Sequence, residues 1–227
     1  MSAFSRNSEK DRAARDAYLD LAAAADQFEQ YANPHAIRIA AIADRIAEGF
    51  HMAPQDRKSL RIAARMHDLG EVAMEREYIK RAGSLTEEER IDLQRHPIIG
   101  EQEAARASAH RDVQLLVRWH HEWWNGSGYP DALRQDEIPL AARILRAADS
   151  YAALTDARPF RAALSEADAR SQIVKLAGIE FDPAVVSVLL AVRNLEEMRS
   201  FARPAEIFEP AAVPVDEGND LFASFMK

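Results

Sequence analysis

Two adjacent histidines lie near the start of the stretch of this sequence that most suggests chemistry, Trp119–Pro130 (WHHEWWNGSGYP). The pattern places their imidazoles at a helix end. A loop follows in which Gly126 and Gly128 are flexible positions, and it ends at Pro130. Ring nitrogens side by side next to an aromatic loop suggest a metal on one side and a substrate on the other. The alternative is a plain turn between two helices, with the histidines near it by chance.

Further ligand-type side chains fall on the apolar faces of predicted helices. His67 completes an i, i+3, i+4, i+7 apolar pattern, which puts it on a buried face with Asp68 beside it. His120 completes the same pattern in a later helix, and Asp149 interrupts another apolar face. Each such residue could be hydrogen-bonded separately in the core, because buried polar groups need partners. A shared metal site accounts for the whole set at once, together with histidines at helix ends: His35, His67, Asp68, His96, His120, His121 and Asp149.

These side chains are too many for one tetrahedral zinc ion and suit two octahedral ions bridged by the carboxylate of Asp68. Mixed imidazole and carboxylate ligation favours Fe, Mn, Ni or Zn, and the sequence does not select among them. Two ions about 3.5–4 Å apart can position a bridging hydroxide for in-line attack on phosphorus. The chemistry that this predicts is phosphodiester hydrolysis without a covalent enzyme intermediate.

The elements that must position these residues are predicted to be helices throughout, with no strand of any length. Pro34, Thr86 with its capping box, Ser165 and Asp182-Pro183 mark helix starts, and a break with extended backbone is expected at His96-Pro97. The predicted helices span residues 9–31, 34–48, 57–69 (capped by Asp56), 86–95, 98–109, 112–120 (capped by Asp112), 139–154, 165–177 and 183–201, with a connector at 71–85.

Composition limits the class of protein. The chain has 227 residues, 48% of them hydrophobic and 29% charged, which is typical of a globular domain. It has no cysteine, so disulfides, thiolate nucleophiles and cysteine-ligated metals are excluded. No run of 18 apolar residues and no signal core is seen, so a soluble cytoplasmic protein without membrane contact is expected. The net charge of −8 argues against a nucleic-acid polymer as partner.

Several separate motifs occur in an order that closely resembles the HD-GYP domain, a branch of the HD superfamily of metal-dependent phosphohydrolases. The resemblance spans roughly residues 30 to 190. The motifs are His35, His67-Asp68-Leu69-Gly70, Gly83-x-Leu85-Thr86, His96-Pro97-x-x-Gly100, His120-His121-Glu122, Asn125-Gly126-x-Gly128-Tyr129-Pro130, Ile138-Pro139-Leu140-x-Ala142-Arg143-Ile144, Ala148-Asp149, Arg158-Pro159-Phe160-Arg161 and Phe181-Asp182-Pro183.

The resemblance implies a compact all-α bundle of the HD type with additional C-terminal helices. It also implies a di- or trinuclear metal centre that hydrolyses cyclic di-GMP to linear pGpG or to GMP. Because Tyr31 stands where members with three metals have a glutamate, two divalent ions are expected, Fe or Mn before Ni or Zn. The seven side chains above carry over as ligands, with Asp68 as the bridge. Catalytic roles fall on Asp68, His67 and Glu71, and the loop contacts with substrate fall on Gly126, Gly128 and Tyr129. Arg158 and Arg161 carry over as phosphate contacts, since a guanidinium fork suits a phosphate.

The chain departs from the family pattern at several positions. Glu71 stands where a lysine is usual, and it would repel phosphate or approach the metals. Ala152 replaces a frequent second aspartate, Asn125 replaces the aspartate of a common Asp-Gly pair, and Tyr31 replaces the glutamate of members with three metals. These departures leave two alternatives to a cyclic di-GMP phosphodiesterase. One is a weakly active or inactive metal-bearing module that signals by binding, and the other is a hydrolase of another cyclic dinucleotide.

The chain is predicted to divide into an N-terminal helical extension (1–30), the HD-GYP domain (31–201) and a proline-rich tail (202–227). A homodimer or a signalling partner could use the N-terminal helix or the tail, where Phe222 and Phe225 stand. The alternative for the tail is packing onto its own domain.

Overall fold

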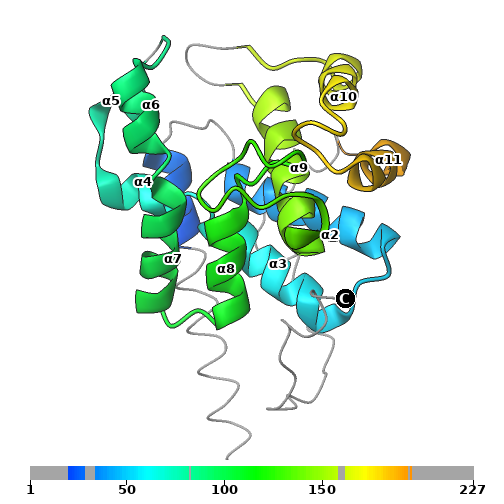
Figure 1. Ribbon diagram of the computed structural model, residues 1–227, viewed down its shortest axis with the longest axis horizontal. Helices are drawn as coiled ribbons and strands as arrows, with labels where there is room; N and C mark the ends of the chain where they lie inside the picture. Colours follow the sequence, from blue (N-terminus) through cyan, green and yellow to red (C-terminus); the bar gives the residue numbers. More distant parts are fainter. Residues whose placement is uncertain (1–19, 29–33, 82, 158–161, 194, 196–227) are drawn as a thin grey trace, which may run out of the picture.

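The computed structural model describes residues 20–28, 34–81, 83–157, 162–193 and 195 (Figure 1). Within this part of the chain the regular elements are helices, and the only strand-like pairing is an isolated bridge between Ala177 and Phe181. The all-α prediction is confirmed. Residues 20–28 are helical, followed by α2 (His35–Gly49), α3 (Pro54–Met66), α4 (Leu69–Met74), α5 (Glu77–Lys80), α6 (Glu87–Leu93), α7 (His96–Arg106), α8 (Arg111–Trp119), the 3-10 helix η1 (Gln135–Glu137), α9 (Leu140–Thr155), α10 (Glu166–Lys175) and α11 (Pro183–Ala191).

The core forms where α2 packs against α3 and α9, while α8 closes it from the other side of α3. Ile39, Ile42 and Ile46 make a continuous stripe along α2, and all of them are fully buried. Their spacing of three and four residues keeps them on one helix face, so the same stripe that predicts the helix also fixes which side faces inward. Among the described residues, none of the helices combines the length and the apolar character that a membrane crossing requires.

The segment around His67 and Asp68 differs from its predicted form. The helix begins at Pro54 and ends at Met66, three residues earlier than expected at each end, so Asp56 lies in its first turn and does not cap it. Asp68 leaves helical geometry (φ −99°, ψ 15°), and the predicted connector instead contains α4 and α5. The physical reason is that a turn after Met66 lets the chain change direction while both polar side chains stay buried.

The predicted break before α7 is present, but the prediction of extended backbone at His96 is wrong. α6 ends at Leu93, and α7 begins at His96 itself, after an Arg95 with helical dihedral angles (φ −84°, ψ −16°). Pro97 lies in the first turn of α7, where its missing N–H has no intrahelical partner to lose. The proline therefore starts a helix, and His96 is carried by a rigid helix end.

The predicted caps are confirmed at three helix starts, because Thr86 and Glu89 form the capping box, Ser165 accepts from the N–H of Asp168, and Asp182 accepts from that of Ala184. Asp112 does not cap α8, because His110 occupies that position. α11 ends at Ala191 and not near residue 201. Most of the predicted extension and the whole predicted tail lie outside the described residues, so the domain boundaries stay a prediction.

Two glycines allow α4 and α7 to touch. A Cβ on Gly70 would lie 1.9 Å from the carbonyl oxygen of His96 and 2.8 Å from the backbone nitrogen of Gly100. A Cβ on Gly100 would in turn lie 2.9 Å from Cγ1 of Val117 on α8. This close backbone approach fixes the position of His96 relative to the turn that carries Asp68.

We expect Gly70→Ala to destabilise the fold, because the methyl group has no space against the backbone of α7. Overpacking of this kind costs about 1–3 kcal/mol, which corresponds to a fall in Tm on the order of 5 °C for a chain of this size. Thermal unfolding followed by circular dichroism measures the effect. Ala105→Ser, which adds an atom on the exposed face of α7, is the matched control. An equal Tm for the two variants would contradict the close approach.

Candidate metal centre

The structure brings together all seven side chains that the sequence singles out, in two neighbouring clusters. Each member can offer one donor atom such that the donors of its cluster lie within 4.8 Å of one another. Their segments converge because α7 and α8 pack side by side, and α7 begins and α8 ends at the upper ends of these two helices in Figure 1. The first cluster is Asp68, His96, His120 and His121, and the second cluster is His35, His67 and Asp149.

Asp68 lies between the two clusters. Its Oδ2 is 2.7 Å from Nε2 of His67 in the second cluster, while its Oδ1 is 3.5 Å from Nε2 of His96 and 3.8 Å from Nε2 of His120 in the first. Burial alone raises the pKa of this carboxyl, but the surrounding imidazoles hold it well below its usual range. Asp68 therefore stays ionised and faces both clusters at once, as a bridging ligand must.

Backbone carbonyls fix the orientation of three of the imidazoles. The Nδ1 of His67 lies 3.0 Å from the oxygen of Ala64, that of His96 lies 2.8 Å from Leu93, and that of His120 lies 2.6 Å from Val117. A carbonyl oxygen only accepts, so each Nδ1 carries a hydrogen, and the neutral rings of His96 and His120 keep their lone pair on Nε2. In all three cases this is the nitrogen that lies near Asp68.

His35 is oriented by a carboxylate that the sequence did not reveal. Its Nδ1 donates to Oδ2 of Asp156 at 2.7 Å, and Nη1 of Arg38 donates to Oδ1 of the same residue at 2.5 Å. All three side chains are buried. Burial raises the pKa of Asp156, but the hydrogen bonds from His35 and Arg38 outweigh it and lower the pKa below the ordinary 3.8. A signal was available, because Arg38 falls one turn after His35 on the buried face of α2.

The protonation states fit a metal. Burial lowers the pKa of His35, His96, His120 and His121, so these rings are neutral at physiological pH. His67 differs, because the carboxylates of Asp68 and Asp149 overcome its burial and raise its pKa to about 9. Bound metal would replace that proton, as metal ligation of a histidine requires. The ionised carboxylate of Asp68 and the neutral imidazoles are donors that a divalent ion can use.

The aromatic loop is packed against the first cluster and not free to swivel at Gly128. A Cβ there would lie 2.2 Å from the nitrogen of Trp123 and 2.5 Å from the oxygen of His121, so Gly128 serves close packing. Gly126 has φ +84°, which a glycine adopts without strain. The ring of Tyr129 stacks on His121 with centroids 4.8 Å apart and planes 21° apart. The loop therefore borders the first cluster.

Glu122, another residue without an assigned role in the sequence, holds this loop. Its buried carboxylate accepts from the N–H of Asp131 at 2.7 Å and from that of Leu133 at 3.0 Å. Burial raises the pKa of Glu122, although these hydrogen bonds favour its ionised form. In the sequence, the position of Glu122 directly after the histidine pair was the available sign of a role. Its hydrogen-bond partners are seen only in the folded loop.

The remaining predicted site residues lie outside the clusters. Glu71 is in the first turn of α4, and its charge contributes to the raised pKa of Tyr129, whose main cause is burial. Glu71 is therefore within electrostatic reach of the loop. Ala152 is buried on α9, and its carbonyl oxygen accepts from Arg38. Arg158 and Arg161, like Tyr31, lie outside the described residues.

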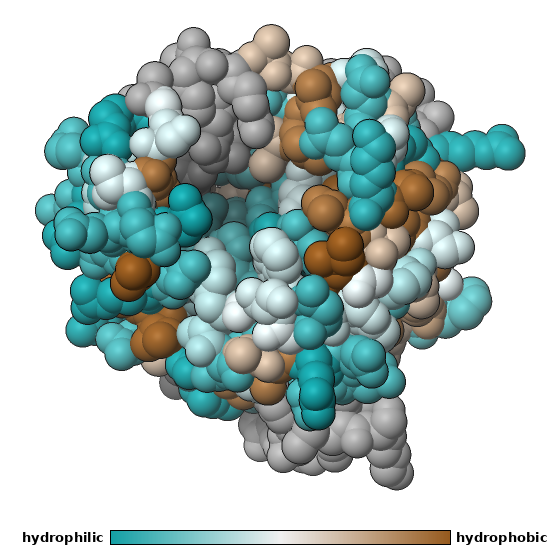
Figure 2. All heavy atoms as spheres, turned by 45° about the horizontal axis from the view of Figure 1, so that its top comes forward, coloured by the Kyte–Doolittle hydropathy of each residue, from teal (hydrophilic) through white to brown (hydrophobic). Residues whose placement is uncertain are grey.

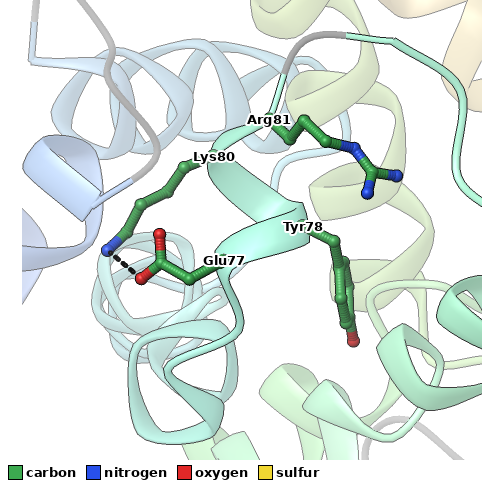
Figure 3. Close-up of a pocket in the computed structure, with 4 residues that line it drawn as sticks. All are labelled: Glu77, Tyr78, Lys80 and Arg81. Carbon is green, nitrogen blue, oxygen red and sulfur yellow. Dashed lines mark ion pairs between the residues drawn. The ribbon is translucent and has the colours of Figure 1, made fainter.

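The surface on this side of the molecule is hollowed. Figure 2, in which the top of Figure 1 is turned forward, shows a hollow whose floor is hydrophilic. A pocket of about 450 Å³ is lined by Glu77, Tyr78, Lys80 and Arg81 of α5 and the residue after it (Figure 3). None of these residues belongs to either cluster, and Figure 3 shows Tyr78 and Arg81 on one side of α5 with Glu77 and Lys80 on the other. We therefore place the chemistry at the clusters.

Comparison with known proteins points to one family. The family model described as HD domain matches residues 20–185. A cyclic di-GMP phosphodiesterase response regulator of Xanthomonas campestris is 36% identical over 165 residues, which cover 71% of this chain and 43% of that protein. A cyclic di-GMP phosphodiesterase of Vibrio cholerae is 34% identical, covering 78% and 39%. A 3′3′-cGAMP-specific phosphodiesterase of V. cholerae is 29% identical, covering 78% and 34%. The chain thus spans less than half the length of these relatives.

Solved structures support the fold. A cyclic GMP-AMP specific phosphodiesterase of V. cholerae aligns with a TM-score of 0.59 at 19% identity, covering 92% of this chain and 56% of the other. The HD domain of the L. monocytogenes phosphodiesterase PgpH aligns with a TM-score of 0.53 at 12% identity, covering 75% and 95%. At these identities the likeness establishes the helical architecture alone.

We expect Asp156→Asn to weaken both the fold and the binding of metal. Loss of the charge leaves Arg38 buried without its counter-ion, which costs about 3 kcal/mol, and loosens His35, which lowers Mn(II) affinity by roughly 10–100-fold. Because the pKa of Asp156 is lowered in the folded state, its stabilisation is present above the ordinary pKa of 3.8 and is lost as the pH falls further. The difference in unfolding free energy should therefore be full at pH 7 and shrink below about pH 4.

Urea unfolding and calorimetric Mn(II) titration measure these effects. Asp112→Asn is the matched control, since Asp112 is equally buried but pairs with His110 and not with a cluster member. Unchanged Mn(II) affinity in Asp156→Asn would show that Asp156 does not position His35.

Proposed function

The chain belongs to the HD-domain family, in its HD-GYP branch, and from that premise we propose that it is a metal-dependent phosphodiesterase of cyclic dinucleotides. We infer cyclic di-GMP as the substrate, cleaved to linear pGpG or to GMP, because two of the relatives described above bear that activity in their names. The observation that most supports the proposal is the pair of clusters with the Asp68 carboxylate facing both.

The residues that would hold the metals divide between the clusters. His35, His67 and Asp149 form one set, and His96 and His120 form the other, with Asp68 shared. His121, which the sequence also predicts as a ligand, differs from these because Arg146 faces its Nδ1. Two divalent ions fit this set, with Fe or Mn favoured over Ni or Zn for mixed imidazole and carboxylate donors. When bound, such ions supply an activated water and neutralise charge on the phosphoryl oxygens.

The protein's own contribution is preorganisation. The Nδ1 hydrogen bonds to backbone carbonyls and to Asp156 keep the rings in place, so the centre does not have to rearrange as charge develops on the phosphate. Tyr129 and the loop held by Glu122 cover one side of the first cluster and exclude bulk water there. Gly126 and Gly128 allow that loop its path, and we propose that Tyr129 contacts the substrate. Arg158 and Arg161 remain proposed phosphate contacts.

A second candidate function is a binding module with little turnover. Glu71 supports it, because a carboxylate within electrostatic reach of Tyr129 opposes the approach of a phosphate. A substrate other than cyclic di-GMP is a third candidate, supported by the similarity to a 3′3′-cGAMP-specific enzyme. The two experiments below separate these candidates.

The first experiment measures metal per chain after anaerobic purification and then cleavage of cyclic di-GMP and of 3′3′-cGAMP. We expect cleavage of cyclic di-GMP that falls at least about 100-fold in Asp68→Ala, because the shared carboxylate is lost. Asp20→Ala, an exposed aspartate of the helical segment 20–28, is the control. Metal without cleavage above the Asp68→Ala level would favour the binding module, and faster cleavage of 3′3′-cGAMP would assign that substrate.

The second experiment reverses the charge at Glu71. We expect Glu71→Lys to raise kcat/KM on the order of tenfold, since about 1.4 kcal/mol of improved attraction for an anionic substrate suffices for that change. Glu71→Gln should lie between the two, and Glu88→Lys on the exposed side of α6 controls for net charge. Unchanged or lower turnover would mean that Glu71 is a working part of the centre.

A further inference from the structure

Arg146 stands on α9 at the border of the two clusters. Its Nη1 lies 3.2 Å from Nδ1 of His121 in the first cluster and 3.1 Å from Oδ2 of Asp149 in the second. Its Nη2 donates to Oε1 of Glu180 at 2.5 Å. The side chain is 15% exposed, so these contacts are largely shielded from water. One guanidinium thus touches a predicted ligand of each cluster.

The contact with His121 decides which ring nitrogen carries the hydrogen. A guanidinium is always charged and has only donors, so Nδ1 of His121 must be the acceptor. In the neutral ring the hydrogen is then on Nε2. His96 and His120 have the opposite arrangement, because their Nδ1 atoms face carbonyl oxygens. The neutral His121 ring consequently has no lone pair left for a metal while Arg146 is in place.

Arg146 is held in this position from several sides. Oδ2 of Asp149 accepts from it, while Oδ1 of the same carboxylate lies 3.8 Å from Nε2 of His67. Glu180 is buried, and its carbonyl oxygen accepts from the N–H of Trp124 at 3.1 Å, which ties the segment before α11 to the aromatic loop. Tyr129 stacks against the His121 ring. Ring and guanidinium are therefore fixed by groups from three segments: α9, the segment before α11 and the aromatic loop.

We propose that His121 is a hydrogen-bond donor of the centre and not a metal ligand, and that Arg146 is the positioning residue that sets its tautomer. The first cluster then offers a metal Asp68, His96 and His120, which leaves coordination positions for water and substrate. The inference rests on the proposed function in one respect: the group that accepts the hydrogen bond from Nε2–H of His121 is a phosphoryl oxygen of a cyclic dinucleotide. Donation from Nε2–H to that oxygen transfers no proton and strengthens as negative charge grows there during cleavage.

The tautomer can be observed directly in the metal-free protein. Long-range proton–nitrogen NMR spectra of histidine-labelled protein distinguish Nε2–H from Nδ1–H rings. We expect His121 to show Nε2–H, with His96 and His120 as internal references that show Nδ1–H. A hydrogen on Nδ1 of His121 would overturn the proposal.

The metal-binding role can be measured by Mn(II) titration of single variants. His120→Ala should lower the affinity at least about tenfold, whereas His121→Ala should keep it within about threefold of the wild type. Equal losses in the two variants would overturn the proposal. Neither measurement uses a nucleotide, so failure of the proposed function would appear separately, as absent cleavage beside an intact Mn(II) site and the expected tautomer.

A double-mutant cycle tests the part assigned to Arg146. Arg146→Met keeps the length of the side chain without its donors, so it should release the His121 lone pair and make His121→Ala cost about tenfold in Mn(II) affinity. Arg143→Met is the matched control, since Arg143 lies on the same helix, is also 15% exposed and pairs with Asp182 instead. Glu180→Gln, which weakens the anchor of Arg146, should act in the same direction. Additive effects of the Arg146 and His121 substitutions would show that Arg146 does not control the ring.

Discussion

The structure depends on one buried carboxylate, that of Asp68, which lies among imidazoles from two clusters. An ionised group with this burial is costly unless charges and hydrogen-bond donors surround it, and here His67, His96 and His120 do so. Those rings can approach only because two backbones nearly touch at Gly70 and Gly100. Gly70 of α4 and Gly100 of α7 are therefore as necessary to the geometry of the centre as the ligands are.

Around Asp68 the polar groups form a connected network, in which almost every imidazole ring is oriented by a hydrogen bond at its Nδ1. Carbonyl oxygens at the ends of α3, α6 and α8 orient three rings, and Asp156 with Arg38 orients His35. His121 is the exception, because a cation faces it. Such outer contacts fix tautomers and so decide which nitrogen is free for chemistry. Histidines of one centre can therefore have different chemical roles.

Electrostatics also shapes what the centre admits. The chain carries a net charge of −8, yet its proposed substrate is anionic, so attraction must come from bound metal and from local cations. Arg146 is such a cation, but Asp149 and Glu180 already pair with it. Glu71 adds negative charge within reach of Tyr129. The balance of these few groups, and not the overall field, governs access.

The sequence by itself determined the helices and the ligand types. Apolar spacing in α2, α8 and α9 predicts both helix and buried face, because one face of a helix repeats every three to four residues whatever it packs against. Helix ends were less certain, as at Met66 and His96, because they depend on what packs around the turn. Only the tertiary structure decided the partners: Asp156 lies 121 positions from His35, and Arg146 lies 25 from His121. Contacts between distant segments leave no local period, so ring orientation, and with it the role of each histidine, follows from packing alone.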